Sequence, residues 1–206
     1  IAGRIKPDSG YVDIGSTVKL GYFTQESDVV DDTLKVIDYI KNIAEIVETS
    51  EGKITASQML EKFLFTPDLQ YNTVRRLSGG EKRRLFLLSI LMKAPNILLL
   101  DEPTNDLDIE TLTILEDYLE TFCGAVITVS HDRYFLDKVV NTILELPGDG
   151  TVKEYNGGYS DYIVVRTIEE KSGLDDKPTI VKNNEKDIRE KPKKLKFSFN
   201  EQQEYN

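Results

Sequence analysis

Two adjacent carboxylates directly follow a short apolar run near the middle of the chain. Residues 97–100 read Ile-Leu-Leu-Leu, and Asp101 and Glu102 come next. So short and apolar a run predicts a strand buried on both faces of a parallel sheet. The last residues of such a strand reach the sheet edge where ligands of open α/β folds bind. At that edge Asp101 can hold Mg²⁺, and Glu102 can polarise a water that attacks a γ-phosphate.

A glycine-containing turn precedes these carboxylates by about twenty residues. Residues 77–81 read Leu-Ser-Gly-Gly-Glu and open a helix predicted to run to about Lys93. Gly79 and Gly80 let the backbone approach a polyphosphate, Ser78 supplies a hydroxyl donor, and a helix N-terminus carries partial positive charge. A turn of this kind on its own more often only caps a helix. Its position ahead of Asp101 favours an anion site.

Two further polar side chains follow predicted strands. His131, the only histidine, comes after the apolar run 125–129, and Gln25 comes after residues 21–24. Because parallel strands end at the same edge, we expect both side chains near Asp101 and Glu102. There an imidazole can contact a γ-phosphate, and an amide can bridge a metal ion and the attacking water.

The elements that position these residues alternate along the chain. Apolar spacing predicts helices over residues 33–48, 55–65, 78–93, 109–122 and 133–139, and strands over 11–14, 18–23, 97–100, 125–129, 142–146 and 151–155. Strands alternating with helices of this length indicate an α/β layered fold. We find no internal repeat.

Composition bounds the class of protein. The 206 residues suit one domain plus a tail, and 39% hydrophobic residues suit a packed core. The 30% of charged residues and the lack of an apolar run near twenty residues exclude a membrane span and predict a soluble protein. No export signal is visible at the start, so we expect a cytoplasmic location. The single Cys123 cannot form an internal disulfide and is expected to be a small core residue.

Charge is distributed unevenly along the chain. The net charge is −10; residues 171–206 hold nine basic and seven acidic side chains, which leaves 17 basic and 29 acidic ones in residues 1–170. An acidic body argues against a broad nucleic-acid surface and confines such contacts to local patches or to the lysine-rich run 191–196. A solvated linker is the simpler interpretation of that run.

Taken together, the order and spacing of these segments resemble the ATP-binding cassette (ABC) superfamily. Gln25 resembles the Q-loop, residues 77–81 the signature, 97–102 the Walker B strand, 105–108 the D-loop, and His131 the switch histidine. The resemblance implies ATP and Mg²⁺ as cofactors and an ATPase activity. It implies Glu102 and His131 as catalytic residues, Gln25, Ser78, Gly79, Gly80, Glu81, Asp101 and Asp106 at the nucleotide, and Asp101 and Gln25 at the metal.

Finer features are similar to the ABC-F class of that superfamily. These are Glu81 in place of the common glutamine, residues 104–108 (Thr-Asn-Asp-Leu-Asp), residues 130–137 and the closing run 157–162. The class implies two cassettes in one chain without membrane domains, and ribosome binding near the tRNA exit site with ATP turnover gating release. The implied partners are therefore ATP, a first cassette of the same parent chain, and the ribosome with tRNA.

Residues near the end of the chain help to decide whether this is the first or the second cassette. Residues 193–204 resemble the linker before the C-terminal coiled coil of the Uup-like branch, whose coiled coil is implicated in nucleic-acid binding. That coiled coil does not occur in these residues. The resemblance therefore favours the second cassette and keeps DNA as an additional partner of the parent protein.

The expected fold class is an ABC-type P-loop NTPase domain, in which helices flank a parallel core sheet beside a helical signature subdomain, truncated at its N-terminus. Residues 1–32 are expected to be the remaining core up to the Q-loop, 33–93 the helical subdomain with the signature helix, 94–170 the core from Walker B to the switch histidine, and 171–206 a charged linker without fixed structure. The sequence contains no Gly-x-x-x-x-Gly-Lys-Ser/Thr. We expect that phosphate loop upstream of residue 1, and an isolated chain that is inactive.

The family's mechanism divides the site residues between two nucleotides. Each ATP is sandwiched between the phosphate loop of one cassette and the signature of the other. Ser78, Gly79 and Gly80 would therefore serve a nucleotide held by the partner cassette, whereas Glu102, Gln25 and His131 would serve their own. Missing core strands would also leave apolar surface exposed.

Three other classes remain open. The ATPase subunit of a membrane transporter is disfavoured by residues 105–108 and by the linker-like tail. A chromosome-maintenance head domain requires a long heptad segment, and the helix over residues 33–48 is too short for one. A non-catalytic interaction module is disfavoured by the presence of Glu102 and His131. The physiological role, whether rescue of stalled translation, ribosome gating, antibiotic protection or DNA transactions, also remains open.

Overall fold

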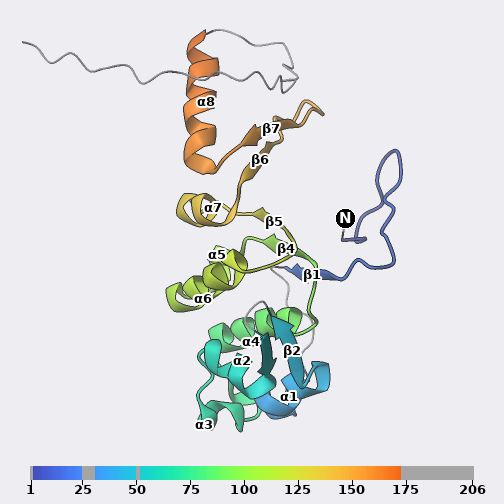
Figure 1. The fold of residues 1–206 in the computed structure, drawn as a ribbon, viewed down its shortest axis with the longest axis vertical. Coiled ribbons are helices and arrows are strands. Elements are labelled where there is room, and N and C mark those ends of the chain that lie inside the picture. The colour runs from blue at the N-terminus through green and yellow to red at the C-terminus, as the bar shows by residue number, and fades with distance from the viewer. Residues whose placement is uncertain (1, 25–30, 50–51, 173–206) are drawn as a thin grey trace, which may run out of the picture.

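A three-stranded parallel sheet forms the centre of the molecule. The computed structural model describes residues 2–24, 31–49 and 52–172 (Figure 1). The strand order is β1 (Leu20–Phe23), β4 (Ile97–Asp101), β5 (Ala125–Val129), all parallel. The middle strand β4 buries residues 98–100 completely or nearly so, which confirms the prediction drawn from its apolar run.

Helices pack beside this sheet and connect its strands. The helix α4 (Gly79–Leu91) packs against β1, whereas α5 (Pro103–Asp106) and α6 (Ile109–Glu120) join β4 to β5. After β5 the chain enters α7 (Arg133–Val139), which packs on α6. This alternation is the α/β fold expected from the sequence.

A second, mostly helical part lies beyond α4, at the lower end of the molecule in Figure 1. It consists of α1 (Val36–Ile43), β2 (Ile46–Thr49), β3 (Gly52–Thr55), α2 (Ala56–Lys62), α3 (Pro67–Gln70) and the 3₁₀ helix η1 (Val74–Arg76). The helix predicted over 33–48 is wrong after Ile43, because residues 46–49 pair antiparallel with residues 52–55. The β-branched side chains Ile46, Val47 and Thr49 favour that hairpin.

The last described elements follow α7. An antiparallel pair of strands, β6 (Thr142–Glu145) and β7 (Lys153–Asn156), leads into α8 (Tyr159–Ser172). The helix α8 was not predicted from the sequence. Its start is fixed by Asp137, whose carboxylate accepts hydrogen bonds from the backbone N–H of Ser160 at 2.7 Å and from its hydroxyl at 2.6 Å. This contact comes from another helix, and a local one adds to it, since Asp161 Oδ2 accepts from the N–H of Gly158 at 3.1 Å.

Two further expectations need correction. Residues 11–14 form no strand, and the regular sheet begins only at Leu20. Cys123 is exposed rather than buried, because it lies in the turn between α6 and β5. The expectations for Gln25 and for residues 173–206 lie outside the described residues.

Apolar surface is exposed on the sheet. Within the described ranges β5 pairs only with β4, and Ile127 and Val129 on β5 are 43% and 58% exposed. None of the helices in that part of the chain is both long and apolar enough to cross a membrane.

Candidate functional site

The backbone at the end of β4 turns sharply to present Glu102. Glu102 has φ 48° and ψ 54°, in the left-handed region that few side-chain-bearing residues adopt. Its N–H donates to the carbonyl of Val129 at 2.8 Å, and Pro103 starts α5 immediately afterwards. Such backbone strain costs about 1–3 kcal/mol and is concentrated at functional sites. The turn places the Glu102 side chain across the end of β5.

His131 meets Glu102 at this edge. The imidazole Nε2 lies 3.2 Å from Glu102 Oε1, and the His131 backbone N–H donates to Glu102 Oε2 at 3.3 Å. The two side chains differ in exposure, since the Glu102 side chain is 16% exposed and the imidazole 92%. Both contacts to the Glu102 carboxylate thus come from His131, and the imidazole of His131 remains accessible to a ligand.

Asp101 lies beside this pair, and its carboxylate makes one long hydrogen bond within the part of the chain that the structure describes. Its Oδ2 accepts a long hydrogen bond of 3.4 Å from the hydroxyl of Tyr22 on β1. Among the residues that the structure describes, no three His, Cys, Asp or Glu side chains group closely enough to hold a metal by themselves. Mg²⁺ takes only one or two carboxylates and completes its shell with water and phosphate oxygens, so Asp101 fits that ion.

A second contact joins the two loops that carry these residues. The hydroxyls of Thr104 on α5 and Ser130 after β5 lie 3.1 Å apart, and Ser130 Oγ also accepts from the N–H of Asp132 at 3.1 Å. Sequence reasoning missed Tyr22, Thr104 and Ser130 as partners of the site. The only available signal was their place at the ends of the same strands.

The turn at residues 77–81 begins α4 as predicted. Ser78 caps the helix: its Oγ accepts from the N–H of Glu81 at 3.3 Å, while its own N–H and hydroxyl donate to Glu81 Oε2 at 2.7 and 2.8 Å. These bonds, from the Ser78 backbone first and its hydroxyl second, lower the pKa of Glu81 below 4.5. The carboxylate of Glu81 therefore holds the Ser78 hydroxyl.

The two glycines of this turn face open space. A Cβ atom placed on Gly79 or Gly80 would meet nothing within 4 Å. Neighbouring atoms of the described chain therefore do not require glycine here, which leaves room for a ligand to approach the exposed helix start.

The structure therefore brings together part of the predicted site. Asp101, Glu102 and His131 gather at the carboxyl edge of the sheet. The turn 78–81 lies apart from them at the start of α4, with no hydrogen bond or ion pair to those three residues within the described ranges. Gln25 and the side chain of Asp106 are not described.

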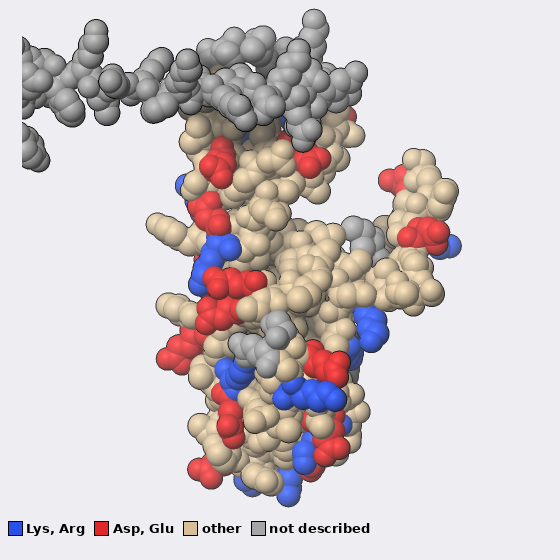
Figure 2. All heavy atoms as spheres, in the orientation of Figure 1, with Lys and Arg blue, Asp and Glu red and all other residues tan. Residues whose placement is uncertain are grey.

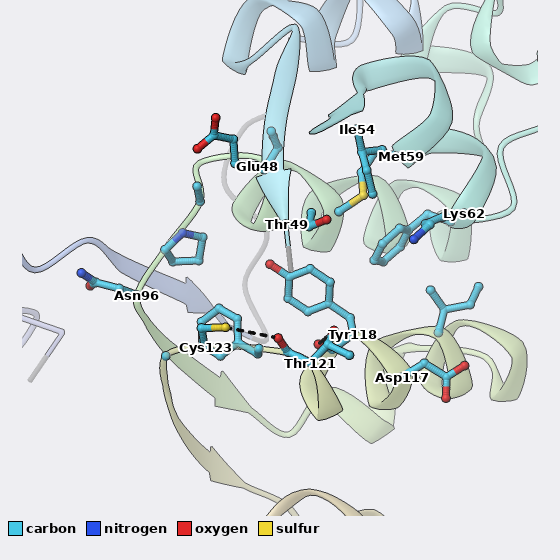
Figure 3. Close-up of a pocket in the computed structure, with 17 residues that line it drawn as sticks. Glu48, Thr49, Ile54, Met59, Lys62, Asn96, Asp117, Tyr118, Thr121 and Cys123 are labelled. Atoms are coloured by element: carbon cyan, nitrogen blue, oxygen red, sulfur yellow. Dashed lines mark hydrogen bonds between the residues drawn. The ribbon is translucent and has the colours of Figure 1, made fainter. Parts of the chain in front are cut away.

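The opposite end of the strands carries an apolar cavity. Its volume is about 630 Å³, and it lies between the helical part, through Met59 and Phe63, and the core, through Tyr118, Phe122 and Cys123 (Figure 3). Burial raises the pKa of the Tyr118 hydroxyl. The cavity borders residues that precede β4 and β5, whereas Glu102 and His131 follow these strands, so the cavity is not part of the carboxylate site.

The side of the molecule drawn in Figure 2 shows no broad basic face among the described residues. On the side of the molecule drawn in Figure 2, the Lys and Arg side chains stand in small groups between Asp and Glu side chains. This pattern matches the acidic body counted from the sequence.

Solved structures with a similar architecture show which fold this chain adopts. The archaeal ribosome recycling factor aABCE1, solved in complex with the ribosomal stalk protein aP1, matches with a TM-score of 0.61 and 20% identity over 81% of this chain and 33% of its own. An ATP-binding cassette dimer bound to ADP and Pi matches with a TM-score of 0.50 and 22% identity, covering 68% of this chain and 63% of its own. The fold is that of ABC-type P-loop ATPases.

Sequence comparison gives the family. Residues 1–105 match the family described as ABC transporter, and the chain belongs to this family. The ABC transporter ATP-binding protein YfmR of Bacillus subtilis, itself uncharacterised, is 57% identical over 164 residues, which are 79% of this chain and 26% of that protein.

Two relatives from Haemophilus influenzae narrow the class further. The ATP-binding protein Uup-like is 36% identical over 216 residues, covering 99% of this chain and 46% of the relative. The energy-dependent translational throttle protein EttA is 41% identical over 162 residues, covering 79% and 29%. These relatives support an ABC-F-like ATP-binding protein. The chain spans less than half the length of each of these three relatives.

Proposed function

We propose that these residues form the second cassette of an ABC-F ATPase that binds and hydrolyses ATP to act on the ribosome during translation. The observation that carries the proposal is the carboxylate of Glu102, fixed at the end of β4 by both the imidazole and the backbone N–H of His131. The similarity to EttA, which is named a translational throttle, supports translation as the process.

In the hydrolytic half-site, Glu102 is the residue that orients and polarises the attacking water. It is mostly buried and has a fixed position, which favours this role because a positioned base needs no reorganisation during the reaction. The exposed imidazole of His131 contacts the γ-phosphate. Asp101, with Gln25 as a further proposed ligand, would hold Mg²⁺, and that ion would neutralise charge on the phosphates when bound.

The signature half-site serves the other nucleotide. The hydroxyl of Ser78 donates a hydrogen bond to a γ-phosphate held by the first cassette, and the partial positive charge at the N-terminus of α4 favours that anion. Because the same hydroxyl donates to Glu81 at 2.8 Å in this structure, nucleotide binding requires its proton to turn from Glu81 to the phosphate. Gly79 and Gly80 let the phosphate approach the backbone.

We propose that residues outside these 206 supply the phosphate loop, because these 206 contain no Gly-x-x-x-x-Gly-Lys-Ser/Thr. We infer that an isolated chain of these residues neither binds ATP tightly nor hydrolyses it. The half-exposed strand β5 is consistent with this inference, since Ile127 and Val129 would be covered by a further strand of the complete core.

Ribosome cosedimentation by the full-length protein tests this function. Wild type, Glu102→Gln and the control Glu110→Gln, an exposed carboxylate in the first turn of α6, are each mixed with ribosomes and with ATP or ADP. We expect Glu102→Gln to stay on ribosomes with ATP but not with ADP, because bound ATP can no longer be hydrolysed. The control should behave as wild type.

Two results would contradict the assignment. If no variant sediments with ribosomes, and ATP hydrolysis responds instead to added DNA, the Uup-type DNA role replaces it. Copurification with a membrane permease would support a transporter subunit. Either result leaves the chemistry of Glu102 in place, since that is read from hydrolysis alone.

A further inference from the structure

Two adjacent arginines on α4 are almost completely buried and point to different neighbours. Arg83 and Arg84 are 8% and 9% exposed. The Arg83 guanidinium lies 4.0 Å from the ring centroid of Phe23 on β1 and 5.7 Å from that of Phe86. Arg84 reaches instead toward the start of α6. Burying a guanidinium costs free energy unless its charge is well compensated, so the burial of each of these arginines needs an explanation.

Arg84 contacts the last residue of the loop that begins at Glu102. Its Nη1 lies 3.8 Å from Asp108 Oδ2 and 3.5 Å from the hydroxyl of Thr111, and its guanidinium carbon lies 5.2 Å from the ring centroid of Phe65. Asp108 in turn caps α6, because its Oδ1 accepts from the N–H of Thr111 at 2.7 Å. Arg84 thus bridges the helical part and the core.

The Arg84 charge faces two carboxylates, that of Glu81 and that of Asp108, whose side chain is 55% exposed, and within the described ranges it makes no short bond to either. The polar contacts of Arg84 with Asp108 and Thr111 are long, and its Nε is buried with no hydrogen-bond partner within the described ranges. A full buried ion pair would have shorter, paired bonds. Stability alone therefore explains this arginine poorly, because an apolar side chain would fill the same space without the desolvation cost.

Position along the chain suggests what the contact does. Arg84 lies on the second turn of α4, whose first turn is the signature at Ser78 and Glu81. Asp108 ends the segment of seven residues that starts at Glu102. Because a helix moves as a rigid element, a shift of the N-terminus of α4 also shifts Arg84. The contact between Arg84 and Asp108 then transmits this shift to Asp108.

We propose that Arg84 is a positioning residue that couples the two ATP sites: it transmits nucleotide binding at the signature, through Asp108, to the loop carrying Glu102. This inference rests on the proposed function, in which Ser78 and Glu102 serve different nucleotides. In this role Arg84 acts without contacting either nucleotide.

A double-mutant cycle in the full-length protein tests the coupling. In the starting protein the catalytic glutamate of the first cassette is replaced by glutamine, so that only the site of Glu102 turns over. The values of kcat and KM for ATP are then measured for Ser78→Ala, Arg84→Met and the double variant. Methionine keeps the buried stem and removes the charge.

We expect Ser78→Ala to lower kcat at the Glu102 site by about tenfold, a typical allosteric coupling, although Ser78 does not touch that nucleotide. In the Arg84→Met background the same change should cost less than about twofold, with KM unchanged. Asp108→Asn, which keeps an acceptor for Thr111 and loses the charge, should give the same result as Arg84→Met. It serves as the second variant should Arg84→Met fold poorly.

Arg83→Met is the matched control, because it removes an equally buried arginine from the same helix that lies over Phe23 and Phe86 instead. In that background Ser78→Ala should keep its full effect. The inference is overturned if Ser78→Ala costs the same factor in every background, or costs nothing at the Glu102 site. If Glu102→Gln leaves hydrolysis unchanged in the starting protein, the proposed function itself has failed, which is a separate outcome.

Discussion

Glu102 and His131 form a two-point contact across the ends of neighbouring parallel strands. One carboxylate oxygen lies 3.2 Å from the imidazole Nε2, and the other accepts from the backbone N–H at 3.3 Å. Because the second bond is made by the backbone, it fixes Glu102 whatever side chain stands at position 131. The imidazole is therefore free to act on a ligand without being the only support of the carboxylate.

This arrangement predicts a selective effect of His131→Ala. ATP binding should be retained, and hydrolysis by the full-length protein should fall by about 10²-fold, the usual cost of removing one positioned polar group from a transition state. Tyr134→Ala, which removes an exposed side chain of the same loop and helix start, is the control and should leave the rate unchanged. Equal rates for wild type and His131→Ala would exclude a role for the imidazole.

The capping carboxylates predict how stability depends on pH. The pKa of Asp108 lies below its ordinary 3.8, because the carboxylate accepts from the N–H of Thr111 first and its hydroxyl second, and because Arg84 is near. The pKa of Glu81 lies below its ordinary 4.5, because its carboxylate accepts from the N–H and the hydroxyl of Ser78. When the pKa of a carboxyl group is lower in the folded protein than in the unfolded chain, the ionised group stabilises the fold. This stabilisation is fully present above the unfolded-state pKa and is lost as the pH falls through the folded-state pKa. Their contribution to the free energy of unfolding should therefore be constant from pH 7 to pH 5 and fall below about pH 4.5.

The variant Asp108→Asn isolates one part of this effect. The difference in unfolding free energy between wild type and Asp108→Asn, followed by circular dichroism in urea, should shrink as pH falls below 3.8. A difference that grows with acid would show that the Asp108 carboxylate is not stabilised in the folded protein.

Close packing of α4 on the sheet predicts a cost for Gly21→Ala. A Cβ atom on Gly21 would lie 2.8 Å from Ile90, 3.0 Å from Leu98 and 3.1 Å from Pro95. These neighbours must move, so we expect a loss of about 1–3 kcal/mol in stability, the usual range for overpacking. Gly15→Ala meets nothing within 4 Å and should change the unfolding temperature little. Similar unfolding temperatures for the two variants would contradict the packing described here.

The sheet and the positions of Asp101, Glu102 and His131 at its edge were predictable because their signals are local. The apolar run before Asp101 and the run before His131 each specify a buried or half-buried parallel strand, and parallel strands end at one edge. Ser78 and Glu81 likewise form a capping box that three-residue spacing alone predicts.

The predictions were wrong where contacts outside the local sequence pattern decide the structure. The chain at Ile46 leaves a helical pattern because a partner strand at residues 52–55 offers hydrogen bonds, and the cap of α8 comes from Asp137, 23 residues before Ser160. The contact between Arg84 and Asp108 joins residues from two elements that share no sequence pattern. Cys123 was placed in the core on residue type, whereas the turn at which it lies is exposed.

ATP hydrolysis by full-length Glu102→Gln, measured beside ATP binding, tests the central claim most directly. Glutamine keeps the shape of the side chain and removes the charge that polarises water. We predict unchanged ATP affinity and a rate lowered by about 10²–10⁴-fold, the contribution of a positioned general base. Hydrolysis at the wild-type rate would show that the carboxylate held by His131 is not the hydrolytic group.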